Sequence, residues 1–175
     1  MTLNLDNLIT NTTGLVHVLA SVLALILGTT TLGLSKGTTL HKKLGYGYAV
    51  AMTIVLTTAF MLYNLFGRWG IFHWAAVASS VTLIAGLLPI MIRSKNYINL
   101  HLGFMYWSVV GLYGAFAAEV SVRIPRVIVE HGIPNTTFYT MTGIGVGAIM
   151  AVSVFFFLKL SPKWENQFSN AYKVN

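Results

Sequence analysis

Five long apolar segments, joined by mostly short connections, constrain the fold more than any other feature of this sequence. A helix needs about 20 mostly apolar residues to cross the hydrocarbon core of a bilayer. The five segments cover approximately residues 12–34, 41–66, 70–92, 98–120 and 138–160. Only 9% of the 175 residues are charged, against about a quarter in an ordinary soluble domain. The sequence therefore predicts an all-α membrane protein of five transmembrane helices, in a single domain over residues 1–175.

The segments outside these helices are short or polar. The connection 121–137 contains Pro125 and Pro134 and cannot form one continuous helix. Residues 161–175 are polar, and we expect them to form a tail at the membrane surface. The first eleven residues hold a single charge, Asp6, which disfavours a cleaved signal peptide. Cysteine is absent, which excludes disulfides, thiolate-bound metals and iron–sulfur clusters.

Lysine and arginine gather on one side of the predicted membrane. In short loops these residues concentrate on the cytoplasmic side. One side carries eight of them: Lys36, Lys42, Lys43, Arg93, Lys95, Lys159, Lys163 and Lys173. The other side carries three: Arg68, Arg123 and Arg126. The bias predicts an N-terminus outside and a cytoplasmic C-terminal tail. Because the net charge of +7 resides in these connections, we expect a lipid partner and no nucleic acid.

Histidines are almost the only ionisable side chains within the predicted spans. The first four segments carry one each, namely His17, His41, His73 and His101. Such groups are costly inside a membrane and commonly functional. The predicted orientation places His17 and His73 near the outer face and His41 and His101 near the cytoplasmic face. Each pair lies on alternate helices, which face each other across a four-helix bundle. We therefore expect the first four helices to form a bundle with one histidine pair at each end.

Two imidazoles that converge across a bundle have the arrangement that axial ligands of a b-type haem need. The basic residues beside each pair could bind the haem propionates: Lys42 and Lys43 on the inner side, and Arg68, Arg123 and Arg126 on the outer side. One or two haems would make the chain an electron carrier across the membrane, between quinol and an acceptor. Whether it is also an enzyme, a membrane-bound oxidoreductase, stays open.

The distance between the two histidine pairs decides whether electrons could pass directly from one haem to the other. At 1.5 Å of rise per residue, His17 and His73 lie about 9 to 12 Å above the midplane, and His41 as much as about 20 Å below it. The pairs are then on the order of 25 Å apart in depth, which is a long gap for direct electron transfer. The small residues that share a face with His17, namely Ser21, Ala24 and Gly28, could leave room for a flat cofactor or a neighbouring helix.

Other kinds of site remain alternatives. A zinc ion wants three or four ligands, and each face offers two histidines, with Glu119 the nearby acid outside. Copper could use histidine together with Met52 or Met105. The histidines could instead serve helix packing or proton transfer in a small transporter or an assembly subunit. In this interpretation, as in the haem interpretation, the fifth helix would be structural or would dock a partner subunit or a second copy. Since no carboxylate pair lies in the membrane, an acid–base hydrolase has little to work with.

Two resemblances follow from these residues. The run from Lys36 to Tyr48, KGTTLHKKLGYGY, with His17 before it and His73 and His101 after it, resembles a family of bacterial predicted membrane proteins. That family usually has HRR where HKK stands here, and the resemblance implies a bacterial cytoplasmic membrane but no activity. The arrangement of two histidine pairs on alternate helices is also similar to the di-haem transmembrane b-type cytochromes that reduce ascorbate or ferric iron. Those cytochromes have six helices, and the resemblance implies haem b.

Overall fold

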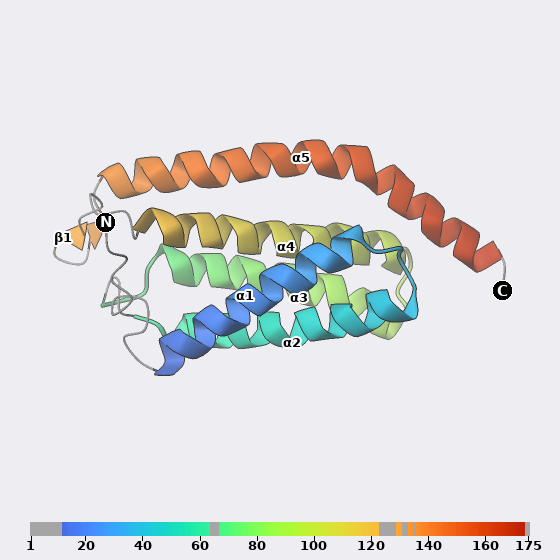
Figure 1. Ribbon diagram of the computed structural model, residues 1–175, viewed down its shortest axis with the longest axis horizontal. Coiled ribbons are helices and arrows are strands. Elements are labelled where there is room, and N and C mark those ends of the chain that lie inside the picture. Colours follow the sequence, from blue (N-terminus) through green and yellow to red (C-terminus); the bar gives the residue numbers. More distant parts are fainter. Residues whose placement is uncertain (1–11, 64–66, 123–128, 131–132, 135, 174–175) are drawn as a thin grey trace.

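In the part of the chain that the structure describes, five helices run back and forth along one axis (Figure 1). The computed structural model describes all residues except 1–11, 64–66, 123–128, 131–132, 135 and 174–175. Within the described part, the helices are α1 (Thr12–Gly33), α2 (Thr39–Met61), α3 (Ile71–Ile92), α4 (Tyr97–Val122) and α5 (Thr136–Lys173). Two short strands, β1 (Val129–Glu130) and β2 (Ile133–Pro134), pair antiparallel between α4 and α5. The predicted all-helical architecture is confirmed.

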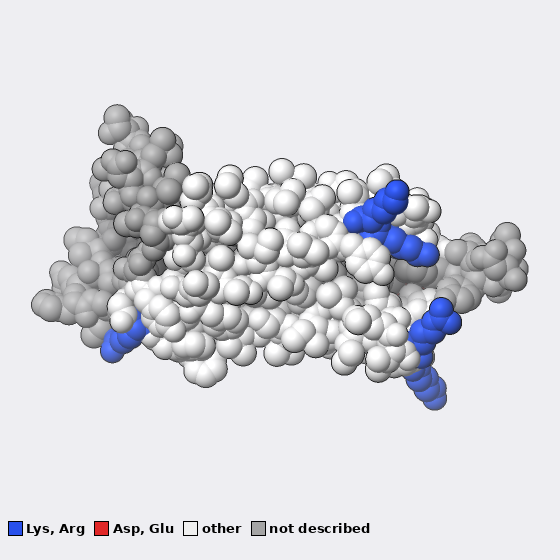
Figure 2. All heavy atoms as spheres, turned by 90° about the horizontal axis from the view of Figure 1, so that it is seen from below, with Lys and Arg blue, Asp and Glu red and all other residues white. Residues whose placement is uncertain are grey.

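The surface of these helices is largely apolar. Leu19, Met91 and Leu158 are each more than 60% exposed, and burial in lipid is the environment that such side chains favour. All five helices are long and apolar enough to cross a membrane. Figure 2 shows a face whose middle carries no charged side chain, with Lys and Arg confined to the two ends. We therefore treat the chain as a multi-pass membrane protein.

The first four helices close a bundle, and α5 lies outside it. Helix α1 packs against α2, α3 packs against α4, and the contacts of α2 with α3 and of α1 with α4 complete the ring. Helices α1 and α3 are therefore diagonal to each other, as are α2 and α4. Helix α5 packs along the outer face of α4 (Figure 1). The bundle predicted from the sequence is present, and its diagonals are those that the histidine pairing assumed.

The seam between α1, α2 and α4 is filled by protein side chains. A Cβ added to Gly28 would lie 2.9 Å from Cε2 of Tyr48 and 3.0 Å from Cγ2 of Val109. The Tyr48 hydroxyl lies 2.8 Å from Oγ of Ser108, and Ala24 beside it is fully buried. We expected the small residues of α1 to leave room for a flat cofactor or a neighbouring helix. At Gly28 the Tyr48 ring takes that room, because a glycine lets a neighbouring aromatic ring approach the backbone closely.

Two helix ends differ from the prediction. Helix α2 ends at Met61 rather than near residue 66, and α5 continues to Lys173 rather than ending near residue 160. The polar tail predicted for residues 161–175 is thus mostly helical. It passes the end of the bundle after a bend (Figure 1), and it contains Pro162, a residue that kinks helices. Trp164 holds this extension to the bundle, since it is only 5% exposed and clusters with Leu102.

Candidate functional site

His41 and His101, the pair expected at the cytoplasmic face, converge across the bundle. His41 lies in the first turn of α2, where the side chain of Thr38 accepts a hydrogen bond from the His41 backbone N–H at 3.2 Å. His101 lies near the start of α4, on the opposite corner of the ring. Their ring centroids are 6.5 Å apart, and the ring planes are nearly perpendicular at 84°. This diagonal therefore carries an imidazole pair at the end of the bundle.

Hydrogen bonding leaves a free ring nitrogen on each of these histidines. Nδ1 of His101 lies 2.8 Å from the carbonyl oxygen of Gly86. A carbonyl only accepts, so Nδ1 carries the proton and Nε2 keeps its lone pair. For His41, Nδ1 is buried without a hydrogen-bond partner. The His101 imidazole is thus oriented by a backbone carbonyl, in the manner of histidines that bind metals.

The separation of the rings selects the kind of coordination they could give. A ring nitrogen about 2.0–2.1 Å from a metal places the imidazole centroid about 3.2 Å from that metal. Two imidazoles on opposite sides of one metal then have centroids about 6.4 Å apart, whereas a tetrahedral angle brings them to about 5.2 Å. The observed 6.5 Å between His41 and His101 matches the trans arrangement. The axial positions of a six-coordinate haem have that arrangement.

The basic side chains around this pair divide into exposed and buried ones. Lys42 and Lys43, which we expected to bind propionates, are exposed at the surface next to His41. Lys36 was counted in the sequence only for membrane orientation, but its side chain is just 6% exposed. Burial lowers the pKa of the Lys36 ammonium to about 8. A lysine two residues before a helix cap gives no sequence signal of burial, so only the tertiary structure reveals that Lys36 is buried.

His17, toward the other end of the bundle, is also held in one tautomer. Its Nδ1 lies 2.8 Å from Oγ1 of Thr58 on α2. That hydroxyl donates its own proton to the Ile54 carbonyl at 2.7 Å, so the Thr58 oxygen accepts a proton from His17 Nδ1. Nε2 of His17 therefore keeps its lone pair. Glu119 on α4 is close enough to act electrostatically on this ring.

His73, the histidine expected to pair with His17, has a different environment. It is 2% exposed, and its ring lies against Tyr63 and Trp69, with centroids 4.6 and 4.8 Å away. The backbone N–H of Gly70 donates to its Nδ1 at 3.1 Å. The neutral ring then carries its proton on Nε2, which is buried and has no hydrogen-bond partner. Because Nδ1 is already an acceptor and Nε2 is protonated, this imidazole lacks a free lone pair for a metal.

The structure thus brings the rings of one predicted pair together, and within the described part of the chain it shows no ring contact between His17 and His73. Arg68 is exposed in the connection between α2 and α3, while Arg123 and Arg126 lie outside the described residues. The two ends are far apart, since Thr58, the partner of His17, follows His41 by 17 residues on α2, or about 25 Å of helix. This agrees with the separation predicted from the sequence.

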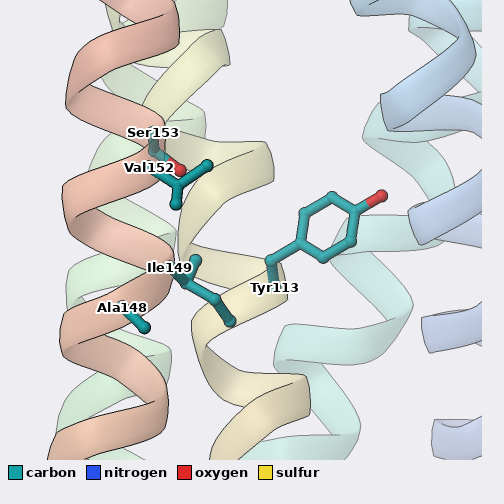
Figure 3. A pocket seen from close by; sticks show the side chains of 5 residues that line it. All are labelled: Tyr113, Ala148, Ile149, Val152 and Ser153. Atoms are coloured by element: carbon teal, nitrogen blue, oxygen red, sulfur yellow. The ribbon is translucent and has the colours of Figure 1, made fainter.

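A hollow between α4 and α5 is a separate feature of the molecule. It has a volume of about 340 Å³ and is lined by Tyr113, Ala148, Ile149, Val152 and Ser153. Figure 3 shows Tyr113 on α4 and the other four side chains on α5. The Tyr113 hydroxyl lies 2.6 Å from Oγ1 of Thr29 on α1, so that polar group is already satisfied. The hollow holds no histidine or acid and is mostly apolar.

Comparison with known proteins adds no assignment. No protein-family model, no curated protein and no solved structure matches this chain. The class that the fold defines is a multi-pass helical membrane protein. The histidine geometry is therefore the feature of this chain that points to a function.

Proposed function

We propose that this chain is a membrane electron-transfer protein that binds haem b between His41 and His101. One observation carries the proposal: the two rings stand 6.5 Å apart across the bundle, the separation of trans ligands on one metal. The positive-inside rule places this end of the bundle at the cytoplasmic face. The membrane would be the cytoplasmic membrane of a bacterium.

The residues around the pair have distinct roles in this proposal. The Gly86 carbonyl accepts from Nδ1 of His101 and leaves Nε2 free, so Nε2 would be the nitrogen that holds the iron. Gly45, one turn after His41, has open space where a side chain would stand, which suits the edge of a flat macrocycle. Lys42 is exposed and would pair with a propionate at the surface. The bound haem would supply reversible one-electron chemistry.

The outer end supports the proposal less directly. His17 offers a free Nε2, but His73 would have to release the Gly70 N–H before it could ligate a metal. We therefore assign one haem to the chain, at the inner pair. A quinol in the bilayer would be the natural electron donor, and a partner protein or ferric iron the acceptor. With such an acceptor the chain would act as a membrane-bound oxidoreductase.

A copper ion held by the same pair is the second candidate. The nitrogen of His41 that lacks a partner is Nδ1, and either imidazole nitrogen can bind a metal ion. Imidazole suits copper and zinc alike, but the ring separation exceeds the value of about 5.2 Å for a tetrahedral zinc site. Copper in a linear, two-coordinate site fits the separation better than zinc.

An absorption spectrum of the purified protein tests the proposal. Protein made with ample haem and purified in detergent is measured after air oxidation and again after dithionite reduction. A Soret band that shifts on reduction, with sharp α and β bands, is the expected result for a bis-histidine haem. The absence of a Soret band would overturn the haem assignment, and elemental analysis for copper and zinc would then decide the second candidate.

A further inference from the structure

Lys36, in the connection between α1 and α2, is a buried cation beside the inner histidine pair. Its Nζ donates to the Thr31 carbonyl at 3.0 Å and to the Leu32 carbonyl at 2.6 Å. These carbonyls belong to the last turns of α1, where the helix dipole favours a positive charge. Nζ also lies 4.8 Å from the centre of a Trp164 ring on α5. Together these contacts compensate the cost of burying the charge.

The same contacts link Lys36 to the histidines. The Thr31 carbonyl that accepts from Lys36 Nζ also interacts with the His41 ring. The charge of Lys36 acts electrostatically on both His41 and His101. Lys42 also acts on His41, but Lys42 is exposed, so water and salt screen its charge.

We propose that Lys36 is a positioning residue that sets the electron affinity of the group bound between His41 and His101. This inference rests on the proposed function. A fixed positive charge stabilises the reduced state of a nearby redox group relative to its oxidised state. Since Lys36 is shielded from water, its effect is larger than that of the exposed Lys42. No bond forms or breaks, and in the assay the electron comes from dithionite through soluble redox mediators.

A redox titration followed by the haem absorption bands measures this effect. We expect Lys36→Met to shift the ratio of oxidised to reduced haem about tenfold toward the oxidised form at a fixed potential. For one electron, this corresponds to a midpoint potential lowered by about 59 mV. Lys95→Met is the matched control, because it removes an equal charge from an exposed side chain six residues before His101. Its expected shift is less than about twofold at moderate salt. Lys36→Arg, which keeps the charge, should retain the wild-type midpoint.

A second variant covers the case in which Lys36→Met fails to fold. Oε1 of Gln167 accepts the backbone N–H of Lys36 at 3.4 Å, so Gln167→Glu adds a nearly isosteric negative charge beside this cation. We expect a shift in the same direction as for Lys36→Met, but smaller. An unchanged midpoint in Gln167→Glu and in every folded Lys36→Met sample overturns the inference, as does an equal shift in Lys95→Met. A wild-type chain without haem bands overturns the proposed function itself, and this inference with it.

Discussion

The contact between α3 and α4 at Gly86 gives the most specific prediction about packing next to the site. A Cβ added at Gly86 would lie 2.7 Å from Sδ of Met105 and 3.2 Å from the Met105 backbone nitrogen. The sulfur can move, but the backbone nitrogen cannot move without displacing α4. Gly86→Ala should therefore push apart the two helices that hold His101 against the Gly86 carbonyl.

The magnitude follows from a comparison with a glycine that has space around it. A Cβ at Gly147 on α5 would meet nothing within 4 Å. Both Gly→Ala variants gain about 1 kcal/mol of helix propensity, but overpacking costs Gly86→Ala a further 1–3 kcal/mol, roughly. For a chain of this size, 1 kcal/mol corresponds to about 2–4 °C in Tm. We therefore expect Gly86→Ala to melt about 2–12 °C below Gly147→Ala.

Thermal unfolding of the two variants in one detergent, followed by tryptophan fluorescence, is the assay. Adding Met105→Ala to Gly86→Ala removes the sulfur contact and should recover part of the loss, with a coupling energy that a double-mutant cycle measures. If Gly86→Ala melts at or above Gly147→Ala, the close approach of α3 and α4 at this point is refuted.

Three further predictions concern single interactions. Tyr48→Phe leaves the fully buried Ser108 hydroxyl without this partner and should cost about 1–3 kcal/mol in the free energy of unfolding; an unchanged melting temperature would contradict the contact. Thr58→Val removes the acceptor for His17 Nδ1 and should lower the free energy of unfolding by a similar amount. The absorption spectrum of a haem between His41 and His101 should stay unchanged in this variant. An altered spectrum would show that His17 takes part in ligation. Burial lowers the pKa of Lys36 from 10.5 to about 8, so between these two pH values the unfolded chain binds more protons than the folded one and the free energy of unfolding should rise with pH. When thermal unfolding is followed from pH 7.5 to 10.5, this rise should be larger in the wild type than in Lys36→Met. Equal pH profiles for the two proteins would refute the lowered pKa.

The helices could be predicted from the sequence because each long apolar segment has one low-energy structure in a bilayer. The end of α5 could not, because residues 161–175 are polar and give no transmembrane signal. Trp164 nevertheless packs against Leu102 and Tyr106, and this contact holds the extended end of α5 against the bundle. Such a contact depends on where the ends of α1 and α4 lie, which local sequence does not determine.

The histidine pairing was predictable only in part. Topology alone places His41 and His101 at one end of one diagonal, and their rings do converge. The tautomers depend on single hydrogen bonds, such as the one from the Gly70 N–H to His73, and no spacing in the sequence indicates them. The same holds for Lys36, whose burial results from the way Trp164 covers it.

The number of haems per chain in histidine variants tests the central claim most directly. The protein is purified after expression with ample haem, and the haem is quantified as its pyridine complex against the protein concentration. We predict about one haem per chain in the wild type, in His17→Ala and in His73→Ala, and almost none in His41→Ala and His101→Ala. Full haem content in His41→Ala and His101→Ala, or none in the wild type, would contradict the assignment of these two histidines as haem ligands.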